Sequence, residues 1–164
     1  MEQKGFSIIE LMVTVVILGF LSAVAVPKLF GFMAKSKASE ISVAAGTYMK
    51  LQETYASEHS KGGSWHEIGY RSPAGNSRGI ASTTNFTYDA TGFYYDWVTE
   101  STVNLNNCPK GSKWFLNYSL SEGAHNIKFW TSSDNVISCI DELTPSFKRL
   151  SNTTTPITTP GGKN

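Results

Sequence analysis

An uninterrupted apolar stretch close to the start of the chain constrains the fold more than any other feature. Phe6–Val26 is 21 residues long and contains a single charged side chain, Glu10. An α-helix rises about 1.5 Å per residue, so a helix of this length extends about 31 Å, close to the roughly 30 Å hydrocarbon core of a bilayer. The stretch therefore predicts a helix that can cross a membrane once.

Glu10 is the exception within this stretch, because an ionised carboxylate in hydrocarbon costs at least a few kcal/mol. One interpretation places it close enough to the interface to reach the headgroups. A second starts from a cut after Gly5, which would give Phe6 a new α-amino group four residues from Glu10, on the same helical face. In a bundle of packed copies, the amine of one chain could pair with the carboxylate of the next, and each would offset the other's desolvation.

The run Lys4-Gly5-Phe6-Ser7-Ile8-Ile9-Glu10-Leu11 resembles the class III signal of type IV pilins. In that family a short hydrophilic leader ending in Gly precedes Phe, a Glu four residues later and a long apolar helix, and Pro27 also falls at the expected offset. The resemblance covers roughly Lys4 to Tyr55. It implies cleavage between Gly5 and Phe6 by a prepilin peptidase on the cytoplasmic side. The same enzyme would methylate the new Phe6 amine and leave its positive charge in place.

The resemblance ends at Tyr55, and the strand signals beyond it complete an α+β fold, in which a long N-terminal α-helix packs on a C-terminal antiparallel β-sheet of four or five strands, as in the type IV pilin fold. The precursor would be a single-pass protein of the inner membrane. Assembly machinery would then build it into an extracellular pilus filament, a helical homopolymer of identical or related pilin subunits, with Glu10 setting the register. Two alternative functions within the family stay open. One is a major pseudopilin of a type II secretion system, although the sequence lacks a clustered Asp/Asn calcium loop. The other is a minor or adhesive pilin.

An ordinary secretory signal peptide is the main rival explanation of the N-terminus. Ala23-Val24-Ala25 fits a small-residue cleavage site, and the product would be a secreted domain starting at Val26. Glu10 inside the apolar region and a helical pattern that continues past Pro27 count against it. The lysines do not follow the positive-inside rule, since Lys4 precedes the span and three lysines follow it, but the leader signature is the more specific signal.

Beyond Pro27 the helical pattern becomes amphipathic. One face carries apolar residues in steps of three and four: Ile41, Ala44, Tyr48, Leu51 and Tyr55. Pro27 has no N–H and clashes with the preceding turn, so a kink or loosened stretch is expected over Gly19–Pro27, where assembled members of the family unwind locally. Gly62-Gly63 is expected to end the helix.

The chain is expected to comprise a cleaved leader (1–5), a long helix (6–58), a globular domain (59–150) and a flexible Thr-, Pro- and Gly-rich tail (151–164). The helix has a membrane or filament-core half (6–26) and an amphipathic half (28–58). Residues 64–84 are read as an irregular connection. Strands are predicted at 86–88, 93–98, 113–120, 127–130 and 136–140, with a hairpin turn at 89–92. The apolar stripe of the helix is the natural cover for one face of this sheet.

No pattern in the chain predicts an enzyme, a cofactor or a metal site. His59, His66 and His125 are scattered, and a solvated His66-Glu67 pair is a simpler reading than a ligand pair. A net charge of +1 gives no electrostatic reason to expect nucleic acid, and loss of the leader removes one acid and one base and leaves that charge unchanged.

Two further features concern the globular domain. Cys108 and Cys139 lie 31 positions apart, and in an exported protein they predict one disulfide, with a free buried pair as the alternative.

Numerous aromatic residues suggest a second hypothesis, in which the protein is an adhesin that presents them to carbohydrate. They are Trp97, Trp114, Trp130, Tyr94 and Tyr95. Aromatic residues at period-two spacing are more often sheet core or subunit interface. Trp130 and Tyr94, opposite the main apolar faces of their strands, are the ones to examine.

Overall fold

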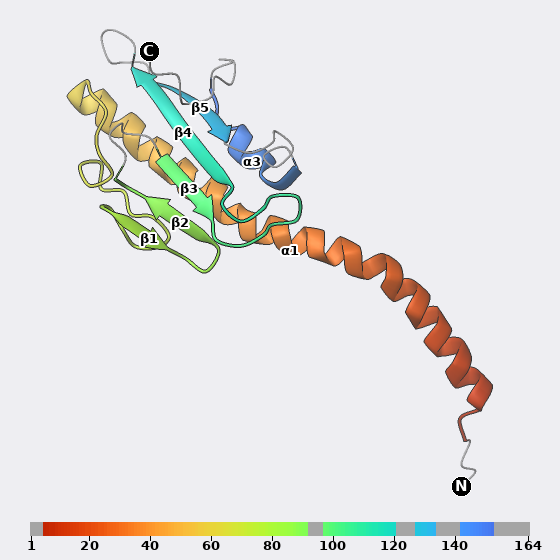
Figure 1. The fold of residues 1–164 in the computed structure, drawn as a ribbon. Helices are drawn as coiled ribbons and strands as arrows, with labels where there is room; N and C mark the ends of the chain where they lie inside the picture. Colours follow the sequence, from red (N-terminus) through yellow and green to blue (C-terminus); the bar gives the residue numbers. More distant parts are fainter. Residues whose placement is uncertain (1–4, 92–96, 121–126, 134–141, 153–164) are drawn as a thin grey trace. The chain divides into compact units, whose positions relative to one another are not determined.

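The computed structural model describes residues 5–91, 97–120, 127–133 and 142–152 (Figure 1). The chain divides into two compact units, Met1–Met33 and Ala34–Asn164, and each is described by itself. Helix α1 (Ile8–His59) supplies the described helical residues of the first unit and the first element of the second.

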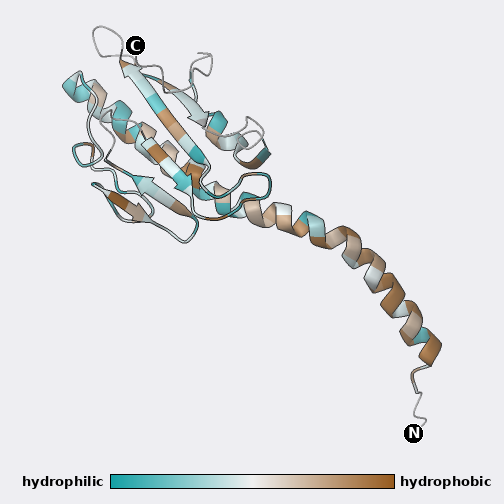
Figure 2. Cartoon of the chain, viewed as in Figure 1, coloured by the Kyte–Doolittle hydropathy of each residue, from teal (hydrophilic) through white to brown (hydrophobic). Residues whose placement is uncertain are grey.

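The first unit is dominated by exposed apolar side chains. From Phe6 to Met33, the exposed fractions of the large apolar residues range from 47% to 80%. Figure 2 shows this part of the helix mostly in the brown of hydrophobic residues. Pro27 lies inside α1, which is helical on both sides of it, and a kink over Gly19–Pro27 stays a prediction. An apolar surface of this extent needs lipid or protein around it, because water alone would solvate it at a large free-energy cost.

The second unit packs the remainder of α1 against an antiparallel sheet. The described strands follow one another in space in chain order: β1 (Ile80–Ser82), β2 (Phe86–Asp89), β3 (Trp97–Ser101), β4 (Lys113–Leu120) and β5 (Ile127–Ser133). A short helix, α3 (Pro145–Lys148), follows. The predicted α+β class, with a long N-terminal helix and an antiparallel sheet of four or five strands, is confirmed.

Individual strands agree with the sequence to different degrees. β4 has the predicted bounds, because its strict alternation of apolar and polar residues is a local signal. β1 was missed: it lies inside the stretch read as irregular, is three residues long and pairs with β2 through Ile80 opposite Asp89. A short edge strand carries too little alternation to be recognised. The strand predicted at 136–140 and most of the one at 93–98 lie outside the described residues.

The core lies between α1 and one face of the sheet. Large aromatic side chains of the sheet, including Trp97 and Trp114, meet a helical face in which Ala38 and Ala45 are completely buried. Small residues on the helix leave room for large ones on the sheet, which keeps the interior densely packed. Of the predicted apolar stripe, Ile41, Ala44 and Tyr48 are buried, whereas Leu51 and Tyr55 are half-buried.

Near its end the buried face of α1 carries a polar residue that sequence reasoning did not place there. Gln52 is completely buried. Its amide nitrogen donates to the Gly63 carbonyl at 3.1 Å, and its amide oxygen accepts from the Gly63 N–H at 3.4 Å. These two bonds satisfy the buried amide and attach the following loop to the helix.

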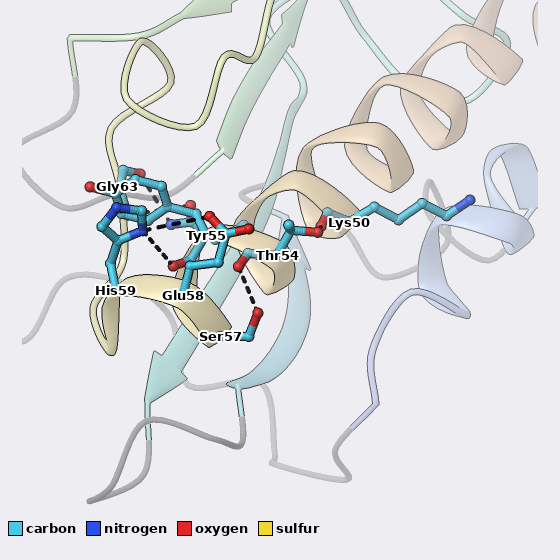
Figure 3. Close-up of polar contacts among 8 residues, drawn as sticks. Lys50, Thr54, Tyr55, Ser57, Glu58, His59 and Gly63 are labelled. Carbon is cyan, nitrogen blue, oxygen red and sulfur yellow. Dashed lines mark hydrogen bonds and ion pairs between the residues drawn. The ribbon is translucent and has the colours of Figure 1, made fainter.

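The glycine pair does not end the helix as expected. α1 ends at His59, whose ring stacks on Tyr55 at 4.2 Å between centroids (Figure 3), and the left-handed residue that follows is Ser60, with φ of 55°. Position 63 instead needs a glycine because the neighbouring side chains leave no room for a Cβ. A Cβ there would lie 2.6 Å from the Ile68 side chain and 2.8 Å from the Tyr55 ring.

Candidate functional site

The predicted cleavage site lies just before the helix. Gly5, Phe6 and Ser7 are exposed and non-helical, and α1 begins at Ile8. Phe6 is 79% exposed, and a Cβ built on Gly5 would meet no atom within 4 Å. The Gly5–Phe6 peptide bond therefore lies in an accessible, irregular segment, the form of backbone that a peptidase can bind.

Glu10 has a partner within its own chain that sequence reasoning missed. Its Oε2 accepts the backbone N–H of Ser7 at 3.2 Å, and the first helical bond runs from the Leu11 N–H to the Ser7 carbonyl, also 3.2 Å. The signal was present in the sequence, because Ser-x-x-Glu ahead of an apolar run is a capping box. A carboxylate in the first turn is also favoured by the helix dipole.

The helix that follows meets the requirements of a membrane span. Within the described residues, α1 is the one helix that is long and apolar enough, and its most apolar 18-residue window has a mean hydropathy of 2.5, with none of that window buried. The site thus consists of an exposed peptide bond, a capped helix start with one carboxylate, and a first part of α1, up to Met33, whose large apolar side chains are exposed.

Comparisons of the sequence with known proteins show which proteins this chain resembles. Residues 1–26 match the family described as "Prokaryotic N-terminal methylation motif". The chain is 36% identical over 79 residues to the type IV major pilin protein PilA of Myxococcus xanthus, covering 48% of this chain and 36% of PilA. It is 35% identical over 122 residues to a fimbrial protein of Neisseria meningitidis, covering 68% of this chain and 63% of that protein. This chain thus resembles type IV pilins and carries the N-terminal methylation motif at residues 1–26.

A third relative, the type IV major fimbrial protein FimA of Dichelobacter nodosus, is 41% identical over 61 residues, which is 37% of the pilin-like chain and 38% of FimA. The chain spans between 36% and 63% of the lengths of these three relatives.

The other predicted site residues of the pilin-like chain are placed as follows. Cys108 is buried, and its backbone pairs with that of Leu105 in an isolated β-bridge. Cys139 lies outside the described residues, so the disulfide stays a prediction. Gly19 lies within α1, and a Cβ there would meet open space. Pairing of Glu10 with the N-terminal amine of a neighbour stays a prediction too.

Two of the aromatic residues raised for carbohydrate binding belong to the core. Trp97 and Trp114 are completely buried, and their indole N–H groups donate to the Tyr70 hydroxyl at 2.8 Å and to Thr144 Oγ1 at 3.2 Å. Trp130 is half-buried on β5, and Tyr94 and Tyr95 lie outside the described residues. The adhesin alternative gains no support from the two buried tryptophans.

A carboxylate attaches the second half of α1 to the sheet. Glu40 Oε1 accepts the Tyr88 hydroxyl at 2.8 Å and the Thr83 hydroxyl at 3.0 Å. Burial, and secondly the bond to Glu40, raise the pKa of the Tyr88 phenol far above its usual value, so Tyr88 stays a neutral donor. Glu40 also lines a groove of about 680 Å³ together with Lys37, Val43 and Arg71. Within the described residues no group of three or more His, Cys, Asp or Glu side chains could hold a metal ion.

Proposed function

We propose that this protein is a structural subunit of a type IV pilus. The observation that carries the proposal is the first unit, a helix whose large apolar side chains from Phe6 to Met33 are 47–80% exposed. Such a helix is stable inside a bilayer or inside a bundle of similar helices. The names of the relatives, two of them major pilins or major fimbrial proteins, support the pilus over a pseudopilin of type II secretion.

In the proposed sequence of events, lipid surrounds the apolar helix first and other pilin helices surround it later. The precursor is held in the inner membrane by α1 as a single span. A prepilin peptidase cuts between Gly5 and Phe6 and methylates the Phe6 amine. Assembly machinery then moves the helix from lipid into the core of an extracellular filament of identical or related subunits. Leaving lipid requires an equally apolar destination, and a bundle of the same helices supplies it.

Glu10 gives the bundle its axial register in this proposal. The cut creates a cationic amine beside the capped helix start, and an amine and a carboxylate from adjacent subunits would each offset the other's desolvation. The Ser7 N–H occupies one position on Oε2 at 3.2 Å. A carboxylate accepts about four hydrogen bonds, so the capping bond and an intersubunit pair are compatible.

The test is mass spectrometry of the mature N-terminus, combined with isolation of sheared surface filaments from cells that express the chain. A product that starts at N-methylated Phe6 and is recovered in filaments is expected. Gly5→Glu should keep the leader attached, whereas Lys4→Gln, the neighbouring change, should still be processed. A product that starts at Val26, or a processed chain found only as a dispersed monomer, would overturn the proposal.

A further inference from the structure

The exposed apolar surface of α1 extends beyond the predicted span. Leu29, Phe30, Phe32 and Met33 follow Val26 and are 58%, 63%, 67% and 48% exposed. Lys28, also exposed, directly precedes Leu29. The segment Lys28–Met33 is called the collar below. It belongs wholly to the first unit, and the membrane segment expected from the sequence did not include it.

Helix length places the collar at a definite depth. At about 1.5 Å per residue, Lys28 lies about 30 Å along α1 from its first residue, Ile8, and Met33 lies about 37.5 Å from Ile8. The hydrocarbon core is about 30 Å thick, and the bilayer with its headgroups about 40–45 Å. With Ile8 at one edge of the core, Lys28 therefore falls at the opposite edge, and the rest of the collar lies at headgroup depth.

A tilted helix is the alternative geometry. To bring the whole of Ile8–Met33 inside the core, the helix would need a tilt of about 37°, close to the upper end of the usual range of about 0–40°. Such a tilt would draw the Lys28 ammonium into hydrocarbon, which costs a few kcal/mol. The upright arrangement avoids this cost, because Lys28 then reaches the phosphates directly.

Charge in this part of the chain has one sign. Between Leu11 and Ser39 there are three lysines, at positions 28, 35 and 37, and no aspartate or glutamate. Basic residues beside a membrane attract anionic headgroups, each by about 1 kcal/mol, which falls as salt rises. Large apolar residues with lysines on either side, as in Lys28–Lys37, are typical of a segment that lies in the interface.

We propose that the collar is a binding surface for anionic phospholipid headgroups, which surround the precursor at the outer face of the membrane before assembly. This rests on the proposed membrane-inserted precursor. The collar sets the depth of the helix, with Lys28 at the phosphates and Phe30 and Phe32 between the headgroups. Its partner is a lipid surface, and the second copy of the chain that later packs on α1 would have to displace these lipids.

The depth is tested with the full chain reconstituted in vesicles of phosphatidylcholine with a minority of phosphatidylglycerol. Phe32→Trp and Phe20→Trp each add one fluorophore, and the signal of the wild type, whose four tryptophans all follow residue 64, is subtracted. A headgroup nitroxide should quench Phe32→Trp most, and a nitroxide deep in the acyl chain should quench Phe20→Trp most. Quenching of Phe32→Trp mainly by the deep nitroxide, or by neither, would overturn the collar.

The lipid class is tested by placing the headgroup-region nitroxide on either of the two lipids at equal mole fraction. The label on phosphatidylglycerol should be enriched about fivefold around Phe32→Trp, the factor that corresponds to about 1 kcal/mol for one basic residue. Lys28→Gln should abolish the preference, and Lys50→Gln, the same charge change elsewhere on α1, should keep it. Equal quenching of Phe32→Trp by both labelled lipids, with Lys28 in place, would refute the anionic partner. Loss of the chain from carbonate-washed vesicles would instead refute the membrane-inserted precursor itself.

Discussion

Replacement of Glu10 separates two roles for this side chain, a helix cap within one chain and a charge partner between chains. Glu10→Gln keeps an oxygen that can accept the Ser7 N–H, now 3.2 Å from Oε2, and removes the charge. Glu10→Ala removes both. If the capping bond were the whole role, only the alanine variant would suffer, by about 0.5–1.5 kcal/mol for one hydrogen bond.

The charge role predicts a much larger effect that both variants share. Removing one partner of a buried ion pair costs about 3–5 kcal/mol, because the other charge is left buried and unpaired. For the Phe6 amine in a filament core, this corresponds to a loss of roughly two to four orders of magnitude in the equilibrium for adding a subunit. We therefore expect Glu10→Gln and Glu10→Ala to abolish filaments alike.

The assay measures three quantities in the same cells: the processed fraction by mass spectrometry, the membrane-bound fraction after carbonate washing, and the filament fraction after shearing. Both Glu10 variants should stay membrane-inserted and cleaved while the filament fraction falls. Glu58→Gln, the same charge change at a side chain of α1 that is 64% exposed, should assemble normally. Wild-type filament yield from Glu10→Gln would refute the register mechanism and leave capping as the role of Glu10.

Three further predictions concern the second unit. Gly63→Ala should destabilise this unit by about 1–3 kcal/mol, because the added methyl overlaps two packed side chains. Denaturant unfolding measures this loss of stability. Gly46→Ala is the control and should be neutral or stabilising, since its Cβ has only an ordinary 3.7 Å contact. The pKa of Tyr88 is raised in the folded state, so stability should fall as the pH rises through about 10, where only the unfolded phenol ionises, and Tyr88→Phe should flatten that fall. Cys108→Ser should cost about 3.5 kcal/mol if the predicted disulfide forms, and equal melting temperatures with and without reductant would contradict the bridge.

Local patterns carried most of what could be predicted. The span and the leader motif are contiguous in the chain, and β4 is a run of strict alternation, so each could be recognised without knowledge of its neighbours. The capping bond from Ser7 to Glu10 is equally local, since Ser-x-x-Glu ahead of an apolar run is enough to predict it.

Elements whose identity depends on distant residues could not be predicted. The apolar stripe of the helix does not include Gln52, yet this residue is completely buried, and the Gly63 backbone satisfies its amide. β1 exists as a strand because β2 pairs with it. Glu40 lies outside the apolar stripe of the helix, but the hydroxyl groups of Thr83 and Tyr88, 43 and 48 positions later, donate to its carboxylate.

The sequence by itself determined that this chain has an apolar helix of membrane-spanning length, a processing motif in front of it and an α+β domain behind it, because hydrophobic periodicity and motif spacing are properties of neighbouring residues. Tertiary structure alone decided where the exposed apolar surface of α1 stops, which polar side chains join the core and that the short segment β1 becomes a strand. The physical reason is that the burial of a side chain depends on whether a partner comes within hydrogen-bonding or packing distance, and that partner is supplied by a remote part of the chain.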